Sequence, residues 1–105
     1  MIDGYLLNMR VFNEVKDSKG QALKPLEEAA EVFGAWRKCD DTRYATMTIR
    51  WAFREDLIDE CMDTVQAVAN VLAAVGATQG EVDAAIKRMD ERNGDRGRLW
   101  EWRER

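Results

Sequence analysis

The segment from Arg54 to Val75 constrains the fold most, because its apolar residues recur with the period of an α-helix. Side chains at positions i, i+3, i+4 and i+7 lie on one side of a helix, whereas a strand alternates every two residues. The apolar side consists of Leu57, Ile58, Cys61, Met62, Val65, Val68, Ala69 and Leu72. Asp56, Asp59 and Asn70 belong to the polar side, where solvent exposure is the favoured interpretation and a position facing the substrate or supporting the site is the alternative. The segment therefore predicts a long amphipathic helix.

Two helices are predicted before it. The spacing of the apolar residues in the first 15 positions predicts a helix from about Ile2 to Val15, followed by a turn from Asp17 to Gly20. A second helix is predicted to start near Leu23. Pro25 then falls in its first turn, where proline is tolerated because that N–H has no partner within the helix.

The stretch from Lys38 to Phe53 has no single assignment. Tyr44 to Trp51 is rich in Thr, Tyr, Ile and Trp, which favour strands. A loop, a short extended piece and an early start of the long helix all fit this composition.

After the long helix, the sequence signals for where helices begin and end are clearer. Gly76 is expected to end it, and Thr78 with Glu81 three residues later forms the pattern of a capping box. A fourth helix is predicted to run to about Arg92, followed by a turn marked by Asn93-Gly94 and Gly97. The charged tail from Arg98 to Arg105 carries Trp100 and Trp102, which are expected to dock on the domain or on a neighbouring subunit.

Composition restricts the class of protein. The 105 residues predict a single all-α domain (1–105), and the small core expected for that length favours at least a dimer. A net charge of −4 argues against a dedicated nucleic-acid binder. With no histidine, imidazole-based catalysis and His-containing metal sites are excluded. Two cysteines, no secretory signal and no bilayer-length apolar run predict a cytoplasmic protein without a membrane partner.

Two pairs of carboxylates occur at helical spacing, Glu28 with Glu31 and Glu60 with Asp63. Residues three apart project from one side of a helix, so each pair presents two oxygen donors to one point. Two such helices packed together make a cage of four carboxylates, a ligand set for Mg²⁺ or Mn²⁺. No Lys or Arg occurs from residue 55 to residue 86 to offset the second pair. The alternative for both pairs is an ordinary solvated helix face.

Four motifs occur in the order of a known family: KPLEEAAE at residues 24–31, ECMD at 60–63, Lys87, and NGDRG at 93–97. Over about Leu23 to Leu99 the chain resembles the MazG-like nucleotide pyrophosphohydrolases of the all-α NTP pyrophosphatase superfamily. The signature of that superfamily is ExxE, a variable gap and then ExxD.

The resemblance implies a four-helix, MazG-like bundle completed by formation of a homodimer or homotetramer. It also implies Mg²⁺-dependent hydrolysis of a nucleoside triphosphate to the monophosphate and pyrophosphate, in nucleotide-pool control or house-cleaning, with Mn²⁺ as a substitute metal. By the same resemblance, the metal-binding and catalytic carboxylates are Glu28, Glu31, Glu60 and Asp63, and the residues that contact substrate phosphates are Lys87, Asn93 and Arg96. The competing hypothesis is a non-enzymatic helical interaction module whose acidic face binds a basic partner.

Overall fold

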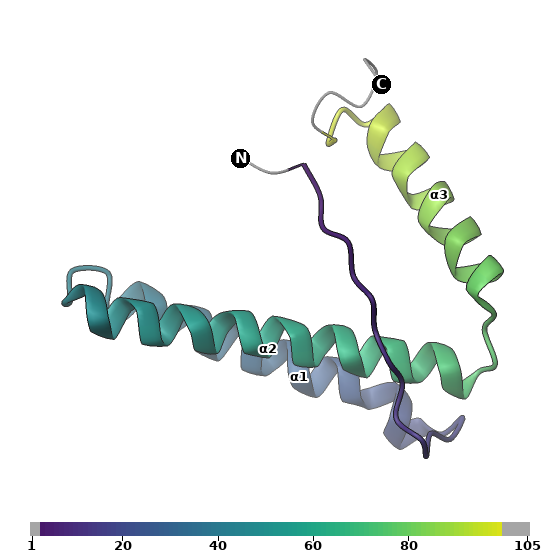
Figure 1. The fold of residues 1–105 in the computed structure, drawn as a ribbon, viewed down its shortest axis with the longest axis horizontal. Helices are drawn as coiled ribbons and strands as arrows, with labels where there is room; N and C mark the ends of the chain where they lie inside the picture. Colours follow the sequence, from purple (N-terminus) through teal and green to yellow (C-terminus); the bar gives the residue numbers. More distant parts are fainter. Residues whose placement is uncertain (1–2, 100–105) are drawn as a thin grey trace. The chain divides into compact units, whose positions relative to one another are not determined.

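A computed structural model of the chain describes residues 3–99, and within that range it contains three α-helices and no strand. Helix α1 spans Lys19–Asp41, α2 spans Met47–Ala74 and α3 spans Gln79–Asp95 (Figure 1). The predicted all-α class is confirmed. In this part of the chain no helix combines the length and the apolar character that crossing a bilayer requires.

The chain divides into two compact units, which are described separately. The first, Met9–Val75, contains α1 and α2, which lie side by side as an antiparallel hairpin joined by the turn at residues 42–46 (Figure 1). The described part of the second unit comprises residues 3–8 and 76–99 and contains α3. Both predicted carboxylate pairs belong to the first unit.

Helix α1 begins earlier than predicted. Ser18 is its N-cap, and the Ser18 hydroxyl accepts a hydrogen bond of 3.2 Å from the backbone N–H of Gln21. The predicted turn at residues 17–20 is therefore wrong, because Lys19 and Gly20 already belong to the helix. Pro25 lies in the second turn of α1, not the first, so its missing N–H removes one internal hydrogen bond of the helix.

The stretch from Lys38 to Phe53 forms the end of one helix, a short turn and the start of the next. The hydroxyl of Thr42 donates a hydrogen bond of 2.7 Å to the Lys38 carbonyl at the end of α1. Thr46 caps α2 by accepting from the N–H of Ile49. Of the three assignments that composition allowed, an early start of the long helix is the one that the structure adopts from Met47 onwards.

The boundary between α2 and α3 was predicted correctly. Gly76 has a φ of 75°, a left-handed conformation that ends α2 and that glycine adopts without strain. Thr78 and Glu81 form the predicted capping box, with reciprocal hydrogen bonds of 3.0 and 3.1 Å.

The end of α3 differs from the prediction. Asn93 and Gly94 lie in the last helical turn, not in a turn after the helix. Gly97, with a φ of 67°, ends α3 in a Schellman motif, in which the N–H of Arg98 donates 2.9 Å to the carbonyl of Asn93. Trp100 and Trp102 lie outside the described residues.

The helix predicted from Ile2 to Val15 is absent from the described residues of that segment. Within a helix, the Arg10 carbonyl and the Phe12 N–H would bond to neighbours four residues away. Here the Phe12 N–H donates to Oδ1 of Asn70 at 3.0 Å, and the Arg10 carbonyl accepts from Nε2 of Gln66 at 2.7 Å. Side chains of α2 thus take the place of the helical hydrogen bonds, and an extended strap crosses α2.

The hairpin buries little apolar surface of its own. Ala67 is the one buried hydrophobic residue among residues 3–99. Each long helix exposes apolar side chains that share a side at helical spacing, namely Leu26, Phe33 and Trp36 on α1 and Ile58, Met62, Val68 and Leu72 on α2. At about 100° per residue, both sets face away from the carboxylate pair of their own helix.

The revised start of α1 predicts the effect of removing its N-cap. Ser18→Ala is expected to lower the free energy of unfolding by about 1 kcal/mol, because the Gln21 N–H loses its acceptor. Ser18→Asp retains an acceptor and should keep most of the stability. Urea unfolding followed by circular dichroism measures both variants, and equal stability of Ser18→Ala and the wild type would place the helix start later.

Candidate metal centre

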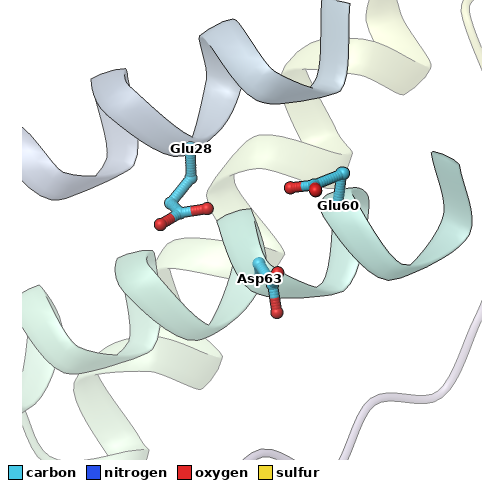
Figure 2. A group of neighbouring side chains, drawn as sticks. All are labelled: Glu28, Glu60 and Asp63. Carbon is cyan, nitrogen blue, oxygen red and sulfur yellow. The ribbon is translucent and has the colours of Figure 1, made fainter. Parts of the chain in front are cut away.

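Carboxylates from the two long helices converge near the middle of the hairpin. Glu28 extends from α1 towards α2, which carries Glu60 and Asp63 one turn apart (Figure 2). One carboxylate oxygen from each of the three residues lies within 4.8 Å of the others. This spacing allows one cation to contact all three side chains.

Glu31, the fourth predicted carboxylate, also belongs to this cluster. Its carboxyl lies near Glu28 on its own helix and near Glu60 on α2, close enough to share a proton with either and so to raise the pKa of both. The structure therefore brings together all four carboxylates that the two sequence pairs supplied. Their assignment as metal ligands stays a prediction.

Crowding of these carboxylates changes their acidity. The pKa of Glu28 is raised, mainly by partial burial and next by the negative charge of Glu31. The pKa of Glu60 is also raised, mainly by partial burial and next by a proton that Glu60 can share with Glu31. Asp63 raises both pKa values further through its charge. The arrangement thus disfavours full ionisation, and a divalent cation is the kind of ligand that would reverse this effect.

One atom in the cluster has no hydrogen-bond partner. Oε2 of Glu60 is buried and accepts no hydrogen bond from the described part of the protein. Buried carboxylate oxygens are normally paired, since desolvating one without a partner is costly. An oxygen-only donor set with an unpaired buried oxygen fits a hard divalent cation such as Mg²⁺ or Mn²⁺.

Two cavities flank the cluster, and Asp63 lines both. The first, of about 400 Å³, lies under the N-terminal strap and is lined at one end by Glu28 and Asp63. The second, of about 540 Å³, is lined by Glu31, Glu60 and Asp63 together with Lys38. The cluster therefore lies between two spaces large enough for parts of a small ligand.

Sequence reasoning missed the residues of the first cavity. For Asn70, exposure was favoured over a position facing the substrate or supporting the site, but Asn70 is only 3% exposed and lines this cavity. Phe12 and Gln66 also line it, and the strap that carries Phe12 was predicted to be a helix. The one available signal was a pair of amides, Gln66 and Asn70, four residues apart within an otherwise apolar stretch.

The predicted phosphate-binding residues lie on α3 or at its end, in the second unit of the chain. Lys87 and Asn93 are six positions apart and so point about 120° away from each other. Asn93 Oδ1 accepts a hydrogen bond of 3.4 Å from Arg98, and Arg96 is the C-cap of the helix. A single side of α3 does not present all three, and their role in binding phosphate stays a prediction.

The aromatic residues of the hairpin gather elsewhere. Trp36 and Trp51 line a third cavity, of about 500 Å³, together with Arg43, Arg50 and Arg54. The Arg54 guanidinium lies 5.2 Å from the centre of the Trp51 ring, a cation–π contact. None of the four clustered carboxylates lines this cavity.

Comparison of the chain with protein-family models, with curated proteins and with solved structures finds no match.

The raised pKa values predict how pH affects stability. Between the ordinary glutamate pKa of about 4.3 and the raised values of the folded state, the folded protein holds protons that the unfolded chain has released. The stability present at low pH is therefore lost as pH rises through the folded-state pKa values. Glu60→Gln removes one of these charges and should raise the melting temperature at pH 7.5 but much less at pH 4.

The matched control is Glu55→Gln, the same change on an exposed residue of α2 outside the cluster. Adding Mg²⁺ should stabilise the wild type and the control more at pH 7.5 than at pH 4, because protons compete with the metal. Thermal melts at both pH values test this. An equal response of Glu60→Gln and Glu55→Gln to Mg²⁺ would contradict the assignment of Glu60 as a ligand.

Proposed function

We propose that this chain is a Mg²⁺-dependent nucleoside triphosphate pyrophosphohydrolase, which cleaves the bond between the α- and β-phosphates and acts on the cytoplasmic nucleotide pool. The observation that carries the proposal is the convergence of Glu28, Glu60 and Asp63, with Glu31 beside them, from two separate helices. The MazG-like order of the motifs assigns these same four residues to metal binding.

Each group in the cluster has a place in the proposed reaction. Glu28, Glu60 and Asp63 would hold the cation, and Glu31, beside Glu28 and Glu60, would add a fourth oxygen donor. A bound Mg²⁺ supplies charge neutralisation of the triphosphate and lowers the pKa of a coordinated water. In the hydrolysis, a water oxygen would bond to the α-phosphorus as the bond to the bridging oxygen breaks, so that the monophosphate forms and pyrophosphate leaves. A carboxylate of the cluster accepts the proton of the water.

Lysines on α1 flank the cluster and suit the phosphate chain. Lys38 lines the cavity on the side of Glu31 and Glu60, and Lys24 lines the one on the side of Glu28. Lys24 is paired with Glu27 at 3.1 Å, whereas no ion pair of Lys38 occurs within residues 3–99. Lys38 is therefore the better placed of the two to neutralise a pyrophosphate leaving group.

The alternative of an acidic interaction module fits the geometry less well. A helix face that binds a basic partner gains from carboxylates spread outwards, where each meets a positive charge. In the hairpin, Glu60 turns one oxygen into a buried position beside two other carboxylates. This inward arrangement favours a small cation over a protein surface.

We further propose that a second copy of the chain covers the apolar sides of α1 and α2, which gives a four-helix assembly. Phe33 is 60% exposed and Trp36 48% exposed, although they stack on each other with ring centres 6.1 Å apart. Contiguous exposed apolar surface of this kind marks an interface. Since these side chains face away from the carboxylates, such an interface leaves the cluster open to substrate.

The proposed reaction predicts a specific product pattern. Incubation with ribo- and deoxyribonucleoside triphosphates and Mg²⁺ should yield the monophosphate and pyrophosphate, and a chelator should abolish turnover. Phosphorus NMR distinguishes these products from diphosphate and phosphate, which would mean that a different bond is cut. Glu60→Gln should lower kcat by at least about 100-fold. Mutating residues that only orient metal ligands typically lowers activity by about 10–100-fold, so a larger loss indicates a direct ligand.

Glu55→Gln serves as the control here too and should retain wild-type kcat. A folded Glu60→Gln variant with unchanged turnover would remove Glu60 from the site. Absence of turnover across the whole panel, with Mg²⁺ and Mn²⁺, would favour the interaction module.

The proposed assembly predicts a dimer or tetramer in sedimentation velocity. Phe33→Glu places a charge on the apolar side of α1 and should shift the protein towards monomer by destabilising the interface. The control is Glu27→Gln, an exposed change on the same helix. A wild-type protein that sediments as a monomer at high concentration would contradict the assembly.

A further inference from the structure

The cavity of about 400 Å³ beside Glu28 and Asp63 contains polar groups that the proposed reaction does not use. The amide side chains of Gln21, Gln66 and Asn70 line it, together with the aromatic side chain of Phe12. All lie in the same unit as the carboxylates, Met9–Val75. Amides that are held in one orientation can select between ligands, so the hydrogen bonds of each amide decide what it offers.

The orientation of Asn70 is fixed by a backbone donor. Its Oδ1 accepts 3.0 Å from the N–H of Phe12 and 3.1 Å from Nε2 of Gln66. A backbone N–H only donates, so the oxygen of Asn70 must face the strap. The group left for a ligand is the Nδ2 amide, a donor with no acceptor within residues 3–99. Glu60 Oε2 is the one buried polar side-chain atom without a partner in that range, so Nδ2 of Asn70, a residue that lines the cavity, stays accessible.

The orientation of Gln66 is fixed in the same way by a backbone acceptor. Its Nε2 donates 2.7 Å to the Arg10 carbonyl as well as 3.1 Å to Asn70. Both protons of that amide are therefore engaged, and the group left for a ligand is the carbonyl oxygen Oε1, an acceptor. Gln21 differs, because no hydrogen bond fixes its side chain in the described structure and it can present either end.

The two amides are hydrogen-bonded to each other, so they combine a free donor on Asn70 with a free acceptor on Gln66. Such a pair is complementary to a group that carries a carbonyl beside an N–H. Uracil, thymine, guanine and hypoxanthine present this lactam edge. Cytosine and adenine present an amino group beside an unprotonated ring nitrogen, which puts donor against donor and acceptor against acceptor. Mismatches of this kind leave polar groups unpaired and are costly in a partly buried site.

The rest of the cavity suits a nucleoside held in this way. The side chain of Phe12 is 60% exposed and offers an aromatic face for stacking on a base. Glu28 and Asp63 line the same cavity, so a base at the amides leaves its phosphates near the carboxylate cluster. The order along the cavity is then base, sugar and phosphate.

We propose that Asn70 and Gln66, oriented by the strap at Arg10 and Phe12, form a base-reading pair that selects nucleotides with a lactam edge over those with an amino edge. Only the placement of the nucleotide's phosphates near the carboxylate cluster rests on the proposed function. The amide pair itself is independent of hydrolysis and is tested without it.

The test uses nucleosides, which carry no phosphate and need no metal. Titration of ¹⁵N-labelled protein by NMR should show uridine and inosine binding at least about tenfold more tightly than cytidine and adenosine, as two matched hydrogen bonds require. The side-chain NH₂ signals of Asn70 should shift with uridine. N3-methyluridine, which lacks the donor for Gln66, should lose this advantage.

Asn70→Asp is the diagnostic variant. It keeps an oxygen for the Phe12 N–H and for Gln66, and it replaces the donor that faces the cavity with an acceptor. In this variant, uridine should bind no more tightly than cytidine. Asn13→Asp makes the same amide-to-acid change at an exposed position that does not line the cavity, and it should leave the preference for uridine unchanged. The wild-type comparison with N3-methyluridine keeps the test decisive if Asn70→Asp does not fold.

The outcomes separate the two proposals. Preference for uridine without hydrolysis of any triphosphate supports the base-reading pair and overturns the proposed reaction. Hydrolysis with equal binding of the four nucleosides overturns the base-reading pair and leaves the reaction intact. Absence of any nucleoside binding, with equal kcat/KM for UTP and CTP, also overturns the pair.

Discussion

Repulsion between carboxylates at the contact of α1 and α2 governs the rest of the hairpin. Helices usually pack through apolar side chains, but near the middle of this contact Glu28, Glu31, Glu60 and Asp63 meet. Burial and like charge both oppose their ionisation, which is why the pKa values of Glu28 and Glu60 are raised. A sequence that only had to hold two helices together gains nothing from this arrangement. The cluster is the arrangement on which the proposal of a bound cation rests.

The same contact explains why a non-helical strap, residues 10–12, lies across α2. Ala67 and Asn70 lie on the turns after Asp63, and these are the most buried positions of the hairpin. An amide at such a position needs partners, and the backbone of residues 10–12 supplies them. Each of these bonds joins a side chain of α2 to the main chain of the strap, so they hold the strap against the helix whatever its side chains are. The cavity beside the carboxylates exists because the strap is fixed there.

Local sequence signals predicted the features that depend on neighbours in the chain. The helical period of Leu57 to Leu72, the stop at Gly76 and the capping box of Thr78 and Glu81 all involve residues a few positions apart, and the structure confirms them. The spacing within each carboxylate pair also predicted that its two members share a side. That the two pairs meet was inferred from the order of motifs and not from periodicity.

The missed features depend on contacts between distant residues or on rival local signals. The spacing of Tyr5, Met9 and Phe12 is helical, but hydrogen bonds to residues 56 and 58 positions away replace the helix in that segment. Asn70 follows the polar side of α2, and only the strap that covers it makes it buried. Ser18 was assigned to a turn because Asp17, Lys19 and Gly20 surround it, although a serine in such a position also caps a helix.

The division of each helix into a carboxylate side and an apolar side links chemistry to assembly. A two-helix hairpin with little buried apolar surface has few contacts to offset the cost of gathering four carboxylates. The exposed side chains of Phe33, Trp36 and Ile58 represent apolar area that can still be removed from water. Because this area faces away from the cluster, covering it stabilises the helices without closing the two cavities beside the cluster, whose linings contain none of these side chains. An electrostatically unfavourable site is thus compatible with a stable protein, provided that its stability comes from the opposite side of the same two helices.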